Sequence, residues 1–258
     1  MLYKINPLRY SDFIAIADTH NCGKVYPLSI AEGIQKGDIF ISSMENYNNV
    51  LFWAYCGFAY LSGKADEYFL EDIYEFMLDR TKLDSRRFLL MTRDEYVQEY
   101  FKSKHDAIVE KRYLFEYSKN REIVEPILPV GYELKEIDNQ LLEEISGKIT
   151  PALFWQDVND FLAKGKGYCI TCDNDIASWA FSAAVSSKEI DIGIETNPKY
   201  KQQGLGLVVA QKMIQYTIGQ EKEPVWACHY QNAASERMAE KLGFVKVSDC
   251  AVIKEIST

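Results

Sequence analysis

The chain has 258 residues, 47% of them hydrophobic and 13% aromatic, a composition typical of a globular protein with one large domain or two modest ones. Its 38 acidic and 29 basic residues give a net charge of −9, spread over both halves, and this argues against the basic face that nucleic-acid binding requires. The sequence has no run of about 18 apolar residues, and its first residues lack the basic and then apolar layout of a signal peptide. We therefore expect a cytoplasmic protein with no membrane contact.

The first half alternates helical and extended patterns. Residues 66–80 carry apolar side chains at three-to-four spacing, with acids near the start, and so predict an amphipathic helix. Thr92 and Glu95 form a capping-box signature that predicts another helix to residue 109, and the uninterrupted apolar run at 50–61 predicts one buried strand. The remaining elements predicted here are a helix at 29–36 and strands at 38–42, 87–91 and 111–117.

The composition changes at residues 119–130, where polar residues and prolines occur. This change predicts a linker between two domains, residues 1–125 and 126–258. In the second domain, Asn232 is a good N-cap for a helix that Gly243 would end. The other elements predicted there are helices at 141–145, 153–163 and 207–219 and strands at 168–171, 176–184, 189–196, 224–230, 244–247 and 251–256.

Two short stretches are alike in the two halves. Gly23-Lys-Val-Tyr-Pro27 and Gly147-Lys-Ile-Thr-Pro151 each precede a predicted helix and then a Lys-Gly pair that opens a strand. The likeness predicts a tandem repeat of one fold, although five-residue matches also arise by chance. The first half has no equivalent of Gln203-Gly-Leu-Gly206, so a repeated first half would have lost this loop.

The stretch from Ile192 to Leu207 predicts a strand, a tight loop and a helix. Pro198 breaks the strand, and Gly204 and Gly206 lead into an apolar, helix-spaced segment. Glycines let a ligand approach the backbone, and the first N–H groups of a helix lack intrahelical acceptors, so the pattern favours a phosphate at this position. A plain helix N-terminus is the alternative interpretation. The spacing fits neither the mononucleotide nor the dinucleotide glycine motif.

The second domain resembles the GNAT superfamily of acyl-CoA-dependent N-acyltransferases. The resemblance rests on Pro198-Lys-Tyr-Lys-Gln-Gln-Gly-Leu-Gly206, followed by a helix, a strand and Asn232-Ala-Ala-Ser-Glu-Arg-Met-Ala-Glu-Lys-Leu-Gly-Phe244. Residues 189–244, with Tyr26-Pro-Leu-Ser-Ile-Ala-Glu-Gly33 in the first half, also look like the branch that includes zwittermicin A resistance acetyltransferases. The resemblance implies an α/β (α+β) fold, with a mixed central sheet flanked by helices in the C-terminal half and a degenerate GNAT-like N-terminal half.

The same resemblance implies a site for acetyl-CoA. The backbone around Ile194 to Thr196 would pair with the pantetheine arm as an added strand would, the glycine loop would hold the pyrophosphate through its N–H groups, and Asn232 would touch the cofactor arm. The implied loop residues are Lys201, Gln202, Gln203, Gly204, Leu205, Gly206 and Leu207.

The sequence departs from the family pattern at two positions. Lys201 replaces the usual Arg or Gln, a mild change because backbone donors carry the site. Ala239 stands where many members have a tyrosine that donates a proton to the leaving thiolate, so the sequence does not name the acid.

Amine acylation needs a base, and carboxylates line the strand that enters the loop. Glu189, Asp191 and Glu195 have the same parity, so they would share one face unless a bulge intervenes. Glu195 and Asp191 are the leading candidates, although exposed charges without a catalytic role are the commoner outcome for strand carboxylates. His229 titrates near neutrality and is a further candidate, against the alternative of an ordinary hydrogen-bonded histidine.

Cys169 and Cys172 have the spacing of half a metal site. In a strand, positions three apart point to opposite faces, and the sequence has no second such pair, so we expect buried free thiols and no metal.

Taken together, the motifs predict an acetyl-CoA-dependent N-acetyltransferase acting on the amine of a small molecule. The competing hypothesis, motivated by Ala239, is a non-catalytic acyl-CoA-binding or regulatory module.

Overall fold

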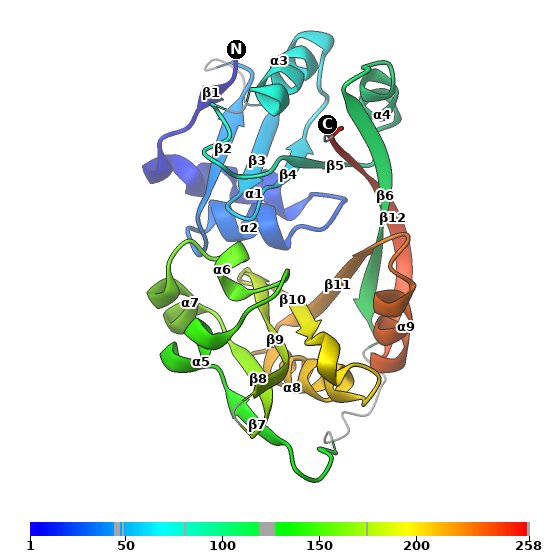
Figure 1. Ribbon diagram of the computed structural model, residues 1–258. Helices are drawn as coiled ribbons and strands as arrows, with labels where there is room; N and C mark the ends of the chain where they lie inside the picture. Colours follow the sequence, from blue (N-terminus) through cyan, green and yellow to red (C-terminus); the bar gives the residue numbers. More distant parts are fainter. Residues whose placement is uncertain (44–46, 48, 80, 119–126, 174, 257–258) are drawn as a thin grey trace. The chain divides into compact units, whose positions relative to one another are not determined.

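The computed structural model describes residues 1–43, 47, 49–79, 81–118, 127–173 and 175–256 (Figure 1). It divides into two compact units. Unit 1 comprises Met1–Leu114, Cys228–Gln231 and Val247–Thr258, and unit 2 comprises Phe115–Ala227 and Asn232–Lys246. The predicted boundary between residues 125 and 126, and most of the predicted linker, lie outside the described residues.

Unit 1 contains a sheet whose strands lie in the order β1-β2-β3-β4-β5-β12-β6. The strands from β1 to β4 pair antiparallel in sequence order, and β5 then pairs parallel to β4. The C-terminal strand β12 returns to this unit and pairs antiparallel with β5. The strands are β1 (Tyr3–Lys4), β2 (Gly37–Ile41), β3 (Val50–Ala54), β4 (Phe58–Ser62), β5 (Leu89–Thr92), β6 (Ala107–Tyr117) and β12 (Phe244–Glu255).

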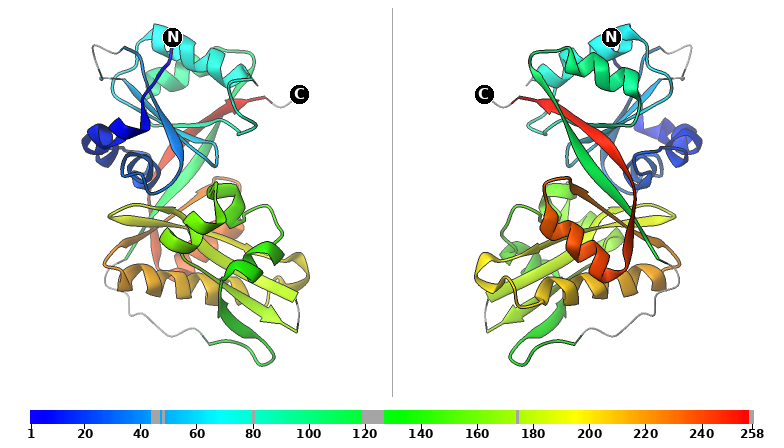
Figure 2. Two further views of the ribbon diagram at one scale, coloured as in Figure 1. Left: turned by 90° about the vertical axis from the view of Figure 1, so that its left-hand side faces the viewer. Right: turned by 90° about the vertical axis from the view of Figure 1, so that its right-hand side faces the viewer.

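Helices cover both faces of this sheet (Figure 2). Because side chains alternate along a strand, Phe40, Leu51 and Trp53 share one face, where they pack in a cluster with Phe69 of α3 and Phe101 of α4. On the other face Tyr26 of α2 stacks on Tyr60 of β4. The helical segments are the 3-10 helix η1 (Pro7–Phe13), α1 (Ile14–Asp18), α2 (Val25–Ala31), α3 (Glu67–Leu78) and α4 (Glu95–Lys102).

Unit 2 has a sheet with the strand order β11-β10-β9-β8-β7. Strands β7 to β10 pair antiparallel, and β11 pairs parallel to β10. The strands are β7 (Glu133–Glu136), β8 (Gly167–Cys172), β9 (Asp175–Val185), β10 (Glu189–Thr196) and β11 (Glu223–His229, the last two residues in unit 1). The helical segments are α5 (Asn139–Glu144), α6 (Pro151–Phe154), α7 (Val158–Lys164), η2 (Pro198–Tyr200), α8 (Leu205–Gly219) and α9 (Ala233–Leu242).

Helices also pack on both faces of the unit 2 sheet. The long helix α8 packs against β8, β9 and β10. The opposite face carries Phe181 of β9, whose ring contacts Phe154 of α6 and Phe161 of α7. The Trp155 indole N–H donates to the Ser182 carbonyl at 2.8 Å and fixes the link between α6 and α7 to this face.

The two units repeat one topology. In each, four strands pair antiparallel in sequence order, a helix follows the fourth strand, and a fifth strand pairs parallel to the fourth. Helix α3 therefore corresponds to α8. This order agrees with the predicted mixed sheet flanked by helices and with the predicted repeat.

The helix that follows the fourth strand begins differently in the two units. At α3 the N-cap is Asp66, whose carboxylate accepts the Phe69 N–H at 2.9 Å. At α8 the N-cap is Gly204, which has no side chain to make such a bond. A carboxylate at a helix N-terminus occupies the place that an anion would take, which agrees with the predicted loss of the phosphate loop in the first half.

Two predicted elements are each divided in the structure. The apolar run at 50–61 is two strands, β3 and β4, because Gly57 adopts a φ of +90° and turns the chain. The predicted helix at 153–163 is α6 and α7, separated where Asp157 caps the second helix by accepting the Asn159 N–H.

Other boundaries also differ from the prediction. Asp94 caps α4, whereas Thr92 belongs to β5 and accepts the Asp94 N–H, and the helix ends at Lys102 rather than at residue 109. Helix α2 lies at Val25–Ala31 and is followed by a turn with Gly33 at φ +68°, so residues 32–36 are not helical. The two final strands, at 244–247 and 251–256, are one continuous β12.

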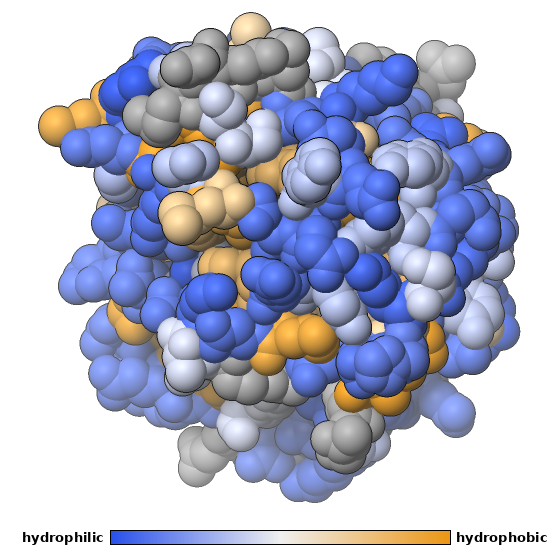
Figure 3. Space-filling model, turned by 90° about the horizontal axis from the view of Figure 1, so that it is seen from above, coloured by the Kyte–Doolittle hydropathy of each residue, from blue (hydrophilic) through white to orange (hydrophobic). Residues whose placement is uncertain are grey.

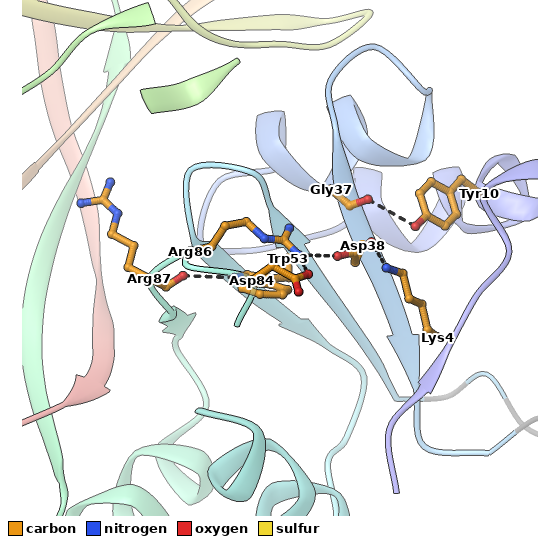
Figure 4. Close-up of polar contacts among 8 residues, drawn as sticks. All are labelled: Lys4, Tyr10, Gly37, Asp38, Trp53, Asp84, Arg86 and Arg87. Carbon is orange, nitrogen blue, oxygen red and sulfur yellow. Dashed lines mark hydrogen bonds and ion pairs between the residues drawn. The ribbon is translucent and has the colours of Figure 1, made fainter. Parts of the chain in front are cut away.

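A buried ion pair ties the sheet of unit 1 to the segment before β5 (Figure 4). Asp38 of β2 accepts from Arg86 at 2.6 Å and pairs with Lys4 at 2.7 Å. The Arg86 guanidinium lies over the Trp53 ring, 3.5 Å from its centroid. Asp38 and Arg86 are only 12% and 13% exposed, so each charge relies on the other.

The face of the molecule shown in Figure 3 is largely hydrophilic, with small separate hydrophobic areas, as the acid-rich composition predicts. Within the described residues, none of the helices combines the length and the apolar content that crossing a bilayer requires.

Candidate acyl-CoA and catalytic site

Strand β10 separates from its parallel neighbour halfway along its length. Its register with β11 covers Glu189 to Asp191, whereas its register with β9 extends from Ile190 to Thr196. Residues 192–196 therefore keep a partner on the β9 side and lose one on the β11 side. This leaves an edge that an extended ligand can join as an added strand.

Hydrogen-bond alternation shows which residues face the open edge. The Asn197 N–H donates to the Ala177 carbonyl at 2.9 Å, in register with the β9–β10 ladder. In an antiparallel pair, alternate residues direct their backbone groups to the same neighbour. Asn197 and Glu195 thus face β9, whereas Ile194 and Thr196, which the resemblance implies as partners of the pantetheine arm, face the open edge.

The loop after β10 turns sharply before it enters α8. Gln202 has φ +64° and Gly204 has φ +80°, both in the left-handed region. These two turns bring the N-terminus of α8 back beside the end of β10. In the described part of the chain, the backbone N–H groups of Gly204, Leu205 and Gly206 donate to no acceptor. Three such donors at the start of a 15-residue helix are suited to an anion.

Gly206 allows α8 to approach β10 closely. A Cβ at this position would lie 3.1 Å from Thr196 Oγ1 and 3.0 Å from Met238 Cε, tighter than ordinary contacts. The absence of a side chain keeps the helix N-terminus next to the open edge of the strand. The residues present therefore fit a ligand that has both an extended amide arm and a phosphate group.

The other predicted loop residues lie at the surface or begin the helix. Lys201, Gln202 and Gln203 are exposed, Leu205 is buried under the loop, and Leu207 is half-buried in the first turn of α8. The exposure of Lys201 agrees with the expectation that backbone donors, rather than this side chain, define the loop.

Asn232 is the N-cap of α9, as predicted. Its side-chain oxygen accepts the Ser235 N–H at 3.1 Å, and within the described residues its amide nitrogen has no acceptor. The Ser235 hydroxyl in turn accepts the Trp226 indole N–H at 3.0 Å. Asn232 is thus held in place and keeps two N–H donors for a ligand.

Glu195 supports a turn that the sequence did not connect with it. Its Oε2 atom accepts the Ile149 N–H at 2.7 Å, and the Trp179 indole donates to the Ile149 carbonyl at 2.8 Å. A Cβ at Gly147 would lie 2.5 Å from the same Oε2 atom. Oε1 has no hydrogen-bond partner in the part of unit 2 that the structure describes. The carboxylate is therefore fixed in orientation, with one oxygen left to accept a proton.

Glu189 and Asp191 lie in the part of β10 that pairs with β11, and both are buried. The register of β10 with β9 shifts by one residue between Asp191 and Ile192. The extra residue at this bulge is Ala183 of β9, and β10 itself runs on without an insertion, so the alternation predicted to place Asp191 and Glu195 on one face is not interrupted between them.

His229 falls in unit 1, with partners of its own. Its Nδ1 atom accepts the Gln231 N–H at 3.3 Å, and its Nε2 atom lies 3.3 Å from Glu110 Oε2. The Lys254 ammonium, 2.6 Å from the same oxygen, lowers the pKa of Glu110 below its usual range. An ionised Glu110 holds the histidine ring in orientation.

The structure also shows the surroundings of Ala239 and of the two cysteines of β8. Ala239 of α9 is fully buried. Its methyl group packs against neighbouring residues and has no proton to donate. Cys169 is fully buried and Cys172 is half-buried. The two residues are three positions apart in β8, so their side chains point to opposite faces of the strand. No group of three or more metal-ligating side chains gathers among the described residues.

The residues that sequence reasoning missed are Ile149 and Gly147. They lie 46 and 48 positions from Glu195, and no local pattern joins them to it. The sequence marks these two residues only through the repeated Gly-Lys stretch at 147–151. That stretch indicates the repeat, and it gives no indication of a contact with a strand carboxylate.

The chain matches known proteins along most of its length. A family model described as GNAT acetyltransferase matches residues 22–252. The uncharacterized N-acetyltransferase YdfB of Bacillus subtilis is 23% identical over 257 residues, 98% of each chain.

Solved structures agree in fold. A GCN5-related N-acetyltransferase-like protein from Streptococcus suis has a TM-score of 0.78 at 19% identity, covering 97% of this chain and 100% of its own. A tandem GNAT protein from the clavulanic acid biosynthesis pathway has a TM-score of 0.65 at 11% identity, covering 100% of this chain and 99% of its own. At these identities the likeness shows the fold alone.

Proposed function

The chain belongs to the GNAT acetyltransferase family and is an acyltransferase, and from this we propose that it transfers the acetyl group of acetyl-CoA to the amine of a small molecule. One observation carries the proposal. The open edge of β10 leads directly into a loop whose Gly204, Leu205 and Gly206 N–H groups have no acceptor in the described part of the chain.

The binding residues divide the cofactor between them. Ile194 and Thr196 would hydrogen-bond the amides of the pantetheine arm, the loop residues 201–207 would hold the pyrophosphate, and Asn232 would donate to the arm from α9. When bound, acetyl-CoA supplies an activated thioester. The protein's part in the reaction is to orient the acceptor amine and to move its proton.

Glu195 is our first choice for the base. Its Oε2 atom is held by Ile149, its Oε1 atom has no protein partner in the described part of unit 2, and the residue lies on the strand that would align the thioester. A carboxylate so placed can take the amine proton directly or through one water. Asp191, Glu189 and His229 remain candidates for proton transfer, and Asp191 ranks second because it lies where β10 and β11 separate.

Further details of the proposal rest on sequence patterns. The stretches at 26–33 and 189–244 support a place in the branch that includes zwittermicin A resistance acetyltransferases. The composition supports a cytoplasmic location, and the change of texture at 119–130 supports domains at 1–125 and 126–258.

The test is turnover with a panel of small primary amines, and the rate is measured by the release of the CoA thiol. We expect thiol release that depends on both amine and enzyme, and acetylated amine as the product by mass spectrometry. Acetyl-CoA at about 100 times its dissociation constant should also stabilise the protein by about 2.7 kcal/mol. No thermal shift with acetyl-CoA would refute the proposal.

The same panel addresses the second candidate function, a non-catalytic acyl-CoA-binding or regulatory module. Its one favouring observation is the buried Ala239 at the position of the usual acid. A thermal shift with acetyl-CoA, without acetylation of any amine in the panel, would favour this second function.

A further inference from the structure

Side chains far apart in the sequence hold both ends of the loop that precedes α8. The Tyr132 hydroxyl donates to Gln203 Oε1 at 2.5 Å, and the Tyr132 ring meets the Tyr200 ring edge-on, with centroids 6.3 Å apart. The Tyr200 hydroxyl donates to Asp175 at 2.7 Å, and Lys199 pairs with the same carboxylate at 2.6 Å. We call these five residues the loop clasp.

The clasp surrounds a strained position. Gln202 lies between the clasp residues Tyr200 and Gln203, and it has φ +64° although it carries a side chain. The left-handed region costs free energy for residues other than glycine, and such a conformation persists when surrounding contacts fix it. The Gln202 side chain is exposed. The neighbouring clasp contacts are therefore the candidates for what holds the loop.

We infer that Tyr132 is a positioning residue for the phosphate end of the cofactor: by holding Gln203, it keeps the loop in the shape that presents the Gly204, Leu205 and Gly206 N–H groups to the pyrophosphate. The inference rests on the proposed function. Tyr132 lies directly before β7 in unit 2, 71 residues from Gln203, where no motif of the loop would identify it.

The contact has a definite expected size. Removing one hydrogen bond that preorganises a loop is expected to weaken ligand binding by about threefold to tenfold. The loss of affinity should occur only for ligands that carry the phosphates. A donor without the nucleotide part does not use the loop, so its affinity should not depend on Tyr132.

The experiment compares Tyr132→Phe with wild type. The dissociation constant of acetyl-CoA is measured by isothermal titration calorimetry, and that of S-acetylpantetheine, which lacks the pyrophosphate, by displacement of acetyl-CoA. We expect acetyl-CoA to bind about threefold to tenfold more weakly to the variant and S-acetylpantetheine to bind equally well to both proteins. Tyr168→Phe, which removes a half-buried tyrosine hydroxyl from β8 of the same unit, is the matched control and should change neither constant.

A double-mutant cycle tests the partner. If Tyr132 acts through Gln203, then Tyr132→Phe has no further effect in a Gln203→Ala background, because the bond is already lost. Additive effects of the two changes on acetyl-CoA affinity would overturn the assignment of Gln203.

The outcomes separate the inference from the proposed function. Wild-type protein that fails to bind acetyl-CoA refutes the function, and the inference with it. Wild type that binds, with Tyr132→Phe binding equally well, refutes the inference alone. An equal loss for acetyl-CoA and S-acetylpantetheine also refutes it, because the tyrosine would then act on the fold and not on the phosphate loop.

Discussion

Replacing Glu195 separates two roles that the structure gives to one carboxylate. Oε2 accepts the Ile149 N–H, and Oε1 is left to accept a proton. Glu195→Gln keeps an oxygen that can accept the Ile149 N–H, but it removes the basic group. Glu195→Ala removes both. The pair of variants therefore measures support of the turn and proton transfer independently.

The expected magnitudes follow from the contacts. A hydrogen bond to a charged group contributes about 1.5 to 3 kcal/mol, and in a protein of this size each 1 kcal/mol shifts the melting temperature by about 2 to 4 °C. Glu195→Ala should thus lower the melting temperature by about 3 to 12 °C, and Glu195→Gln by clearly less. A positioned base contributes about 10²- to 10⁴-fold to the rate, so both variants should lose kcat on that scale.

Thermal unfolding and thiol release with an amine acceptor provide the two measurements. Equal melting temperatures for the two variants would contradict the hydrogen bond from Ile149. A Glu195→Gln variant with wild-type kcat would contradict the role as base and shift attention to Asp191.

Two predictions concern unit 1. The His20 ring accepts the Cys22 N–H and contacts the Leu61 carbonyl, and burial lowers its pKa from 6.5 to about 4, so between these values the unfolded state binds a proton that the folded state does not. Unfolding by urea should show that wild type loses about 3 kcal/mol more stability than His20→Gln as pH falls from 7.5 to 4, and parallel pH profiles would contradict this. Asp38→Ala should destabilise the protein by about 2 to 4 kcal/mol, because it leaves the Arg86 guanidinium poorly paired in a largely buried position. Urea unfolding measures this loss, and a change below about 0.5 kcal/mol would show that the ion pair does not stabilise the fold.

Local patterns predicted the elements whose signals lie within one stretch of chain. The glycines at 204 and 206, the cap at Asn232 and the stop at Gly243 each act on adjacent backbone, and the structure has a helix boundary at each place. The predictions failed where a turn was hidden by apolar neighbours. Gly57 lies among apolar and aromatic residues whose pattern predicts a single strand.

Contacts between distant segments could not be predicted. Glu195 contacts Ile149, and Tyr132 contacts Gln203, across 46 and 71 residues of chain, so only the folded structure brings these groups together. The register shift beside Asp191 depends on pairing with β9 and has no signature in β10 itself. The glycine loop before α8 was therefore predictable as a motif, whereas the groups that support it were not.

Substitutions of Gly204 test whether the loop before α8 holds the pyrophosphate of acetyl-CoA, as we propose. A Cβ here meets no atom within 4 Å, and φ is +80°, a conformation that Asn and Asp adopt more readily than other side chains. Gly204→Asn and Gly204→Asp should therefore fold equally well and differ only in charge.

Isothermal titration calorimetry with acetyl-CoA decides between the outcomes. We expect Gly204→Asp to bind acetyl-CoA at least about tenfold more weakly than Gly204→Asn, because its carboxylate would repel the phosphates. Equal affinity of the two variants for acetyl-CoA, with the same melting temperature, would show that the phosphates do not bind at this loop.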